Sequence, residues 1–339
     1  MSTMGNGDGR MKPITGIWSR VFAGFCAGAV FFAGTVSAQD DYPSKPITLL
    51  VGYAPGGSSD IQARVLADLV GKELRQRVLV ENKAGMSAAI MLNFLARQKP
   101  DGYTVATTPA AALFGNPYML KVDYAHTDFT YVSAFGRLLH AVSVRNDAPW
   151  KTFNELIAHA KDNPGKVKYA TYAPNSTTFW LMRLLAAERG LDWTHVPYNS
   201  DAPAVQALLG GHVDAIAVAS GQVPFVVSGQ LRMLAVFNRV RTPQFPNVPT
   251  VEELGYKITN LTQMTSLTGI VAPKGFSGPA FRKLEAALAK AYRDPSFEAQ
   301  MKNISSPIDL LDSKAYETEV AESAKIAEKI YPEMMKDAK

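Results

Sequence analysis

A Pro-Gly-Gly-Ser-Ser-Asp turn at residues 55–60 has glycines and hydroxyl side chains at a place that could bind an anion. It follows the apolar, β-branched run Ile47–Val51, which predicts a buried strand, and it precedes apolar residues at helical spacing. Ser59 and Gln62 fit a capping box, so we expect a helix to begin there. Backbone N–H groups and the helix dipole at such a start favour an anion. A capped helix without ligand stays open as an alternative, since the turn has no nucleotide-binding glycine pattern.

A second turn of the same kind lies near the middle of the chain. The run Val167–Thr171 predicts a strand, and the polar turn that follows leads into a helix that ends at Gly190. The second turn thus repeats the order of strand, polar turn and helix start. Two such units, each with an open helix start, predict a ligand held between two lobes.

Other side chains give no pattern typical of catalysis. The five histidines form no i, i+4 pair, and neither a zinc-binding H-E-x-x-H motif nor a G-x-S-x-G nucleophile motif is present. The acids Asp60, Asp201 and Asp214 form no pattern with a nucleophile, and Asp214 is typical of a surface turn. We therefore expect a binding protein without catalytic residues, metal or cofactor.

The N-terminal residues have the pattern of a secretory signal peptide. Basic residues precede the apolar run Val21–Phe32, and Val36-Ser37-Ala38 predicts cleavage before Gln39. Cleavage would remove Cys26, the single cysteine, and would reduce the formal charge from +5 to +3, because three basic residues and one acid are lost. That charge is too small to indicate a nucleic acid partner. We expect a soluble exported protein without disulfides.

Strands and helices alternate along the rest of the chain, which predicts an α/β fold with parallel sheets covered on both faces. Thr152 and Glu155 form another capping box, and the C-terminal third, from Pro279, is helical. Further strands are expected at 77–81, 103–108, 129–144, 195–198, 214–219, 231–237 and 267–271, and helices at 86–96 and 202–209.

A series of short motifs, in order and at the right spacing, resembles one known family. The resemblance is to the Bug-type periplasmic receptors of tripartite tricarboxylate transporters, and it covers nearly all of the chain after the leader. The matching segments are Tyr42–Ile47, Pro55–Gly57 with Asp60, Glu81-Asn82, Pro100–Thr104, Glu155–Ala158, Pro164–Lys166, His195–Tyr198, Pro203-Ala204, Leu208–Gly211 with Val213-Asp214, Leu234–Val236 and Val248–Thr250.

The resemblance implies a two-lobed periplasmic binding protein of type II, in which each lobe is a sheet flanked by helices and crossing strands join the lobes. Residues 42–141 and 243–339 would form lobe 1, and residues 142–242 would form lobe 2. A loop from each lobe would hold the carboxylate of a small organic acid through backbone N–H groups. The expected ligand-binding residues are Tyr53, Ala54, Pro55, Gly56, Gly57, Ser58, Ser59, Asp60, Thr108, Ala173, Asn175, Ser176, Thr177, Tyr198 and Ser220.

The family also implies a partner and a location. The expected protein is a periplasmic monomer that delivers its ligand to the membrane components of a tripartite transporter. A receptor that presents ligand to a membrane sensor kinase is an alternative that the sequence leaves open. An exported enzyme is a third hypothesis, and it would need a nucleophile or an acid–base pair in the cleft.

Departures from the family pattern bear on the ligand. The second loop reads Ala173-Pro174-Asn175-Ser176 where the family has Gly-x-Gly-Ser, and Phe179 stands where the family has histidine. These changes favour an aromatic or otherwise apolar acid over a small dicarboxylate, with an apolar cavity wall. The expected wall residues are Met86, Tyr172, Phe179, Trp180 and Tyr198. For Phe179 and Trp180, packing in the core of their own helix stays open as the alternative role.

Overall fold

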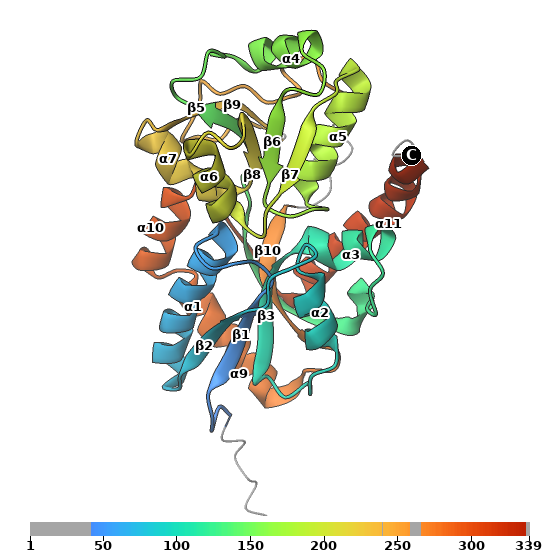
Figure 1. The fold of residues 1–339 in the computed structure, drawn as a ribbon. Helices are drawn as coiled ribbons and strands as arrows, with labels where there is room; N and C mark the ends of the chain where they lie inside the picture. Colours follow the sequence, from blue (N-terminus) through green and yellow to red (C-terminus); the bar gives the residue numbers. More distant parts are fainter. Residues whose placement is uncertain (1–41, 239, 258–265, 337–339) are drawn as a thin grey trace, which may run out of the picture. The chain divides into compact units, whose positions relative to one another are not determined.

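The computed structural model describes residues 42–238, 240–257 and 266–336. The predicted signal peptide at residues 1–38, with Cys26, lies outside the described residues. No helix in the described ranges is both long and apolar enough to cross a bilayer. The fold is mixed α/β, with two sheets that helices flank, as expected for a two-lobed periplasmic binding protein (Figure 1).

The first sheet has six strands in the order β11-β4-β10-β3-β1-β2. β1 pairs in parallel with β2 and β3, whereas β10 is antiparallel to both β3 and β4. Its strands are β1 (Ile47–Val51), β2 (Val78–Asn82), β3 (Thr104–Pro109), β4 (Phe129–Arg137), β10 (Leu267–Pro273) and β11 (Ile308–Leu311).

The second sheet has five strands in the order β7-β6-β8-β5-β9. β6 pairs in parallel with β7 and β8, and β5 is antiparallel to β8 and β9. Its strands are β5 (Ala141–Arg145), β6 (Lys168–Thr171), β7 (Thr194–Pro197), β8 (Ala215–Val218) and β9 (Leu231–Val236). The expectation of parallel sheets is confirmed for β1 to β3 and for β6 to β8. It was wrong for the other strands, because the chain crosses between the sheets after β4 and again after β9, and the crossing strands run antiparallel to their neighbours.

Helices cover the first sheet in two groups. α1 packs against α9 and α10, and α11 packs against α3 and β4, with α2 beside α3 (Figure 1). The bounds are α1 (Ser58–Leu74), α2 (Ala89–Ala96), α3 (Ala110–Met119), α9 (Gly278–Ala291), α10 (Pro295–Asn303) and α11 (Ser313–Lys336). Around the second sheet lie α4 (Phe153–Asp162), α5 (Thr177–Arg189), α6 (Asp201–Leu209) and α7 (Val223–Val227), and the 3-10 turns are η1 (His126–Asp128) and η2 (Ser220–Gln222).

Two of the predicted capping boxes have different outcomes. Thr152 caps α4 as expected, since its hydroxyl accepts the Glu155 N–H at 3.3 Å. The box at Ser59 and Gln62 was wrong, because the N-cap of α1 is Gly57, two residues before Ser59, and this end of the helix has no side-chain cap. The Gln62 side chain is buried and donates to Ser306 Oγ at 3.3 Å instead.

The helix predicted from Met86 begins only at Ala89. Met86, Ser87 and Ala88 have left-handed φ angles of 48°, 52° and 70°, so they form a turn and not a helix. This turn packs closely against the end of β1, where a Cβ on Gly52 would lie 2.2 Å from the Cβ of Ala88. Glycine at position 52 therefore allows the two backbones to approach beside the predicted ligand loop.

Candidate functional site

A small cavity lined by buried residues lies where the loop after β1 meets three segments that follow strands of the second sheet. Its volume is about 10 Å³, close to the space that one water molecule requires. The cavity is lined by Tyr53, Gly57, Ser58, Ser59, Pro109, Leu138, Tyr172, Ser200, Asp201 and Ala219.

Asp60 fixes the shape of the loop after β1. One of its carboxylate oxygens accepts the Gly56 N–H at 2.9 Å and Arg64 Nε at 2.9 Å, and the other accepts Asn82 Nδ2 at 2.9 Å. The same Asn82 amide donates to the Tyr53 carbonyl at 2.9 Å. Burial alone would raise the pKa of Asp60, but hydrogen bonds from Arg64, Gly56 and Asn82 outweigh it and hold the pKa below the ordinary 3.8. Asp60 is thus ionised and shapes the loop from behind.

Asp201 is a buried carboxylate that lines the cavity, at the first position of α6. Its Oδ2 accepts Ser58 Oγ at 2.7 Å and the Gly221 N–H at 3.1 Å, while Oδ1 accepts the Ala219 N–H at 3.2 Å. Burial raises the pKa of Asp201 above 3.8, and hydrogen bonds from Ser58, Ala219 and Gly221 offset only part of that rise. Donors from both sides of the cavity therefore converge on one carboxylate.

The two sides also meet through main-chain and steric contacts. The Ala54 N–H donates to the Asn199 carbonyl at 3.0 Å. A Cβ on Gly57 would lie 3.0 Å from the Cβ of Ser200, so glycine permits this approach. The Ser200 hydroxyl lines the cavity, is buried and has no hydrogen-bond partner in the structure. A polar atom of this kind indicates that a water or a ligand group completes the site.

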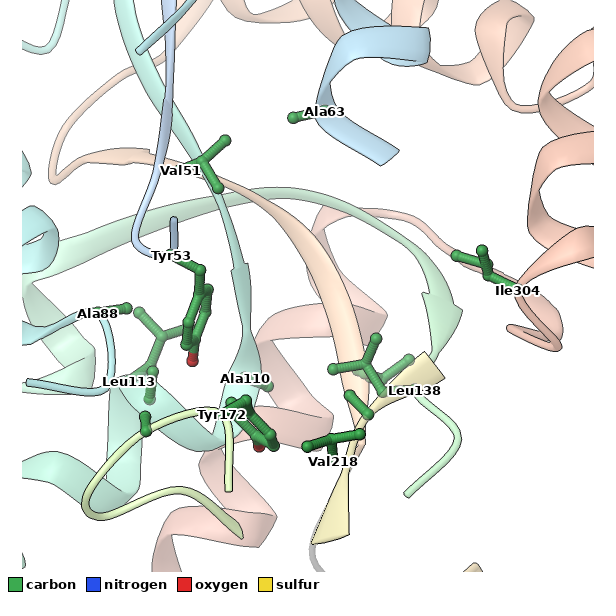
Figure 2. Packing of buried hydrophobic residues seen from close by; sticks show 14 of the residues in the cluster. Val51, Tyr53, Ala63, Ala88, Ala110, Leu113, Leu138, Tyr172, Val218 and Ile304 are labelled. Carbon is green, nitrogen blue, oxygen red and sulfur yellow. The ribbon is translucent and has the colours of Figure 1, made fainter. Parts of the chain in front are cut away.

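Aromatic rings form the apolar wall of the cavity. Tyr53 and Tyr172 meet edge to face with ring centroids 5.9 Å apart, and Leu138 lies on the neighbouring crossing segment (Figure 2). His140 stacks on Tyr172 at 6.2 Å, and burial lowers its pKa to about 4, so this ring is neutral at neutral pH. Burial raises the pKa of Tyr53 well above its ordinary value, and both tyrosines stay protonated.

The second predicted loop forms a capped helix start. The Ser176 hydroxyl accepts the Phe179 N–H at 3.2 Å, and Thr171 Oγ1 donates to the Ala173 carbonyl at 2.8 Å. Thr177 hydrogen bonds to the Tyr172 side chain. The loop therefore positions the ring of Tyr172, and Tyr172 lines the cavity whereas residues 173–177 do not.

The predicted site residues divide into four groups. Tyr53, Gly57, Ser58 and Ser59 line the cavity, and Thr108, Ala173 and Ser220 each precede or follow a lining residue. Pro55 and Gly56 are exposed on the loop, and Asp60 faces away into its hydrogen-bond network. The remaining predicted residues, which also lie outside the cavity lining, are Ala54, Asn175, Ser176, Thr177 and Tyr198.

Sequence reasoning missed the role of Asp201, with Ser200, Pro109, Leu138 and Ala219. The position of Asp201 in the sequence could have indicated this role, because Asp201 begins the helix that follows a strand, as Ser58 does. Its partners are far away along the chain, which hid the contact. Ser58 precedes it by 143 residues.

The expected aromatic wall is formed only in part. Tyr172 lines the cavity, but Phe179 and Trp180 line a separate cavity of about 450 Å³ with His195 and Arg183. Met86 is 46% exposed on its left-handed turn. The alternative of core packing therefore describes Trp180, which is buried against Phe179 and Tyr331.

A larger cavity of about 640 Å³ includes Thr177, His140 and Arg137 among its described lining residues. Arg137 is already paired there, with Asp309 at 2.6 Å and with Glu319 at 2.9 Å. Its charge is therefore balanced by the protein itself. Among the described residues, no group of three histidine, cysteine or acidic side chains could hold a metal ion.

The chain matches one protein family over most of its length. A family model described as "Tripartite tricarboxylate transporter family receptor" matches residues 62–334. The "UPF0065 protein in gbd 5'region" of Cupriavidus necator is 37% identical over 287 residues, which cover 84% of this chain and 86% of that protein.

Solved structures agree with this match. The periplasmic binding protein BugD is 28% identical with a TM-score of 0.78, covering 86% of this chain and 98% of that one. An R. palustris protein solved with adipate is 26% identical with a TM-score of 0.75, covering 84% of this chain and 98% of that one. The chain belongs to the receptor family of tripartite tricarboxylate transporters, the Bug-type solute-binding proteins, which are periplasmic receptors and not enzymes.

Proposed function

We propose that this protein captures a small organic carboxylate between two lobes and delivers it to the membrane components of a tripartite tricarboxylate-type transporter. The convergence of donors at the cavity is the observation that carries the proposal. Ser58 Oγ from one side, and the Ala219 and Gly221 N–H groups from the other, all point at a carboxylate, here that of Asp201. A constellation that holds one carboxylate has the chemistry to hold another.

The lobes in this proposal are residues 42–141 with 243–339 and residues 142–242. The cavity of about 10 Å³ accepts no organic acid, so a ligand enters only if the loops on its two sides separate. The segment between β4 and β5, together with the described residues directly after β9, would act as the hinge. Ligand contacts would come from the loop at residues 53–60, from the segments at 172–177 and 198–201, and from residues near Thr108 and Ser220.

The class of ligand follows from the family and from the wall of the cavity. A relative at 26% identity was solved with adipate, which supports a carboxylate ligand for this chain as well. The rings of Tyr53 and Tyr172 offer an apolar surface beside the donors. An acid with an apolar or aromatic body would use both features. The signal peptide predicted at residues 1–38 would place the receptor in the periplasm.

A thermal-shift screen of the purified protein tests the proposal. Succinate, malate, adipate, citrate, benzoate and 4-hydroxybenzoate serve as probes, with the uncharged amides of adipate and benzoate as controls. A ligand at a hundredfold excess over its dissociation constant stabilises the protein by about 2.7 kcal/mol. We expect at least one acid, and neither amide, to raise the melting temperature. The proposal fails if no acid gives a shift or if acid and amide act alike.

Two variants at position 57 then test the place of binding. Both Gly57→Ala and Gly57→Asp add a Cβ 3.0 Å from that of Ser200, but only Gly57→Asp adds a negative charge. Because the charge would repel a bound carboxylate, we expect Gly57→Asp to weaken acid binding at least ten-fold more than Gly57→Ala does. Equal losses in the two variants would place the anion elsewhere, and the larger cavity around Arg137 would be tested next.

A further inference from the structure

Asp201 is a buried carboxylate that connects the two sides of the proposed ligand site. Its side of the site supplies the Ala219 and Gly221 N–H groups, and the opposite side supplies Ser58 Oγ at 2.7 Å. The residue is 3% exposed. Ser58 begins α1, the helix whose N-terminus the sequence marks as an anion site, so a carboxylate of the chain itself already occupies that position.

No second carboxylate can bind beside Asp201 in this arrangement. The remaining space is about 10 Å³, which holds one water molecule. A ligand carboxylate near Ser58 would also lie within a few ångströms of the Asp201 charge, in a site with little water to screen the repulsion. An acid and the ionised Asp201 side chain therefore compete for the same donors.

Room for the Asp201 side chain depends on a glycine. A Cβ on Gly221 would lie 2.6 Å from Asp201 Cβ and 2.7 Å from Oδ2, so any larger residue at position 221 displaces the carboxylate. The neighbouring Ser200 hydroxyl is buried without a partner and lines the same cavity. The site thus accommodates Asp201 closely and still has an unused polar group for an incoming molecule.

We propose that Asp201 is a resident carboxylate: in the ligand-free protein it occupies the anion position and holds the two sides of the site together, and an acid binds by displacing it. This inference rests on the proposed function, because the displaced contacts are those that the ligand would use. Burial also raises the pKa of Asp201, which agrees with a charge that is poorly solvated at this position. Asp201 accordingly sets how strongly an acid must bind in order to be captured.

Small-angle X-ray scattering of the ligand-free protein tests the holding role without any ligand. We expect the wild type to match the scattering calculated from the closed arrangement, and Asp201→Ser and Gly221→Ala to have larger radii of gyration. Gly221→Ala keeps the charge and moves the side chain, so it separates position from charge. Equal radii in the wild type and in both variants would overturn the proposal.

Isothermal titration with succinate and adipate tests the competition. Asp201→Ser frees the donors and the space, so we expect its Kd for at least one acid to be ten-fold or more below that of the wild type. Asp147→Asn is the matched control, since Asp147 is 71% exposed on the surface and should leave Kd unchanged. Weaker acid binding by Asp201→Ser would overturn the proposal and make Asp201 a group that supports the ligand.

The two experiments separate failure of this inference from failure of the proposed function. If neither wild type nor Asp201→Ser binds any acid, the carboxylate receptor is wrong, and the scattering result alone decides whether Asp201 holds the site closed. If both bind acids with the same Kd and the same ligand-free radius, the receptor stands and the resident carboxylate is wrong.

Discussion

Asp60 and Asp201 are buried near the same cavity, yet their pKa values move in opposite directions. Asp60 is paired with Arg64 and has a lowered pKa, whereas Asp201 has no cationic partner among its hydrogen bonds and has a raised one. At the scale of single residues, the environment and not the residue type decides the role. One aspartate shapes a loop, and the other lies where a ligand is expected.

We predict that Asp60→Asn lowers the free energy of unfolding by about 2–3 kcal/mol, because an amide cannot accept from Gly56, Asn82 and both Arg64 nitrogens together. The half-exposed Arg64 keeps the loss below that of a fully buried ion pair. Urea denaturation of the wild type and of Asp60→Asn measures this difference in the free energy of unfolding. Asp68→Asn on the same helix is the control and should change stability by less than about 0.5 kcal/mol, since both Asp68 and Lys72 are exposed.

The opposite pKa shifts predict opposite pH dependences. The contribution of Asp60 ionisation to the free energy of unfolding is complete above pH 3.8, and it is lost as the pH falls through the lowered pKa of Asp60. The contribution of Asp201 protonation to the free energy of unfolding is complete below pH 3.8, and it is lost as the pH rises through the raised pKa of Asp201. On acidification from about pH 5 to about pH 3, the stability of the wild type should fall relative to Asp60→Asn and rise relative to Asp201→Asn. Slopes of the same sign in urea titrations would contradict the assignment.

At the scale of elements, local patterns predicted a helix start correctly only where its hydrogen-bond partners are close in the sequence. The box at Thr152 and Glu155 forms because its partners are three residues apart and exposed. The similar pattern at Ser59 and Gln62 fails because Gln62 is buried and bonds to Ser306, which is 244 residues away. Tertiary partners of this kind are invisible to spacing rules.

Two helix caps give a prediction at this scale. Ser176 caps α5 next to the proposed site, and Thr152 caps α4. Because each alanine variant leaves one helix N–H without its partner, we expect Ser176→Ala and Thr152→Ala each to cost about 1 kcal/mol of stability. Only Ser176→Ala should also weaken acid binding, measured by titration calorimetry. Equal effects on binding would show that the second loop acts through stability alone.

At the scale of the whole molecule, the fold class and the alternation of strands and helices could be predicted from the sequence, because apolar periodicity reports them directly. The antiparallel position of β10 between β3 and β4 could not, since the paired residues are 130 or more positions apart in the sequence. The same holds for the contact between Asp201 and Ser58. Contacts between the two sheets depend on how the sheets pack together, and no local sequence pattern predicts that packing.

The C-terminal helix offers a prediction at this largest scale. Tyr331 of α11 is buried, stacks on Tyr118 of α3 at 5.9 Å and meets Trp180 of α5 at 6.4 Å. It therefore connects helices that flank different sheets. We expect Tyr331→Ala to lower stability by about 3–5 kcal/mol and to shift the emission of Trp180 to longer wavelength. Tyr331→Phe keeps both ring contacts, so it should lower stability by less than about 1 kcal/mol and leave the emission wavelength almost unchanged. A similar loss of stability in both variants would contradict this role.

The hydrogen bond from the Ala54 N–H to the Asn199 carbonyl has a consequence for how such receptors diversify. It uses only main-chain atoms, so among the common amino acids only proline at position 54 removes its donor. The contact between Ser58 and Asp201 depends on two side chains, and a single codon change abolishes it. Under the role proposed for Asp201, substitutions at position 201 therefore change the anion position, while the main-chain hydrogen bond that joins the two sides of the site is kept.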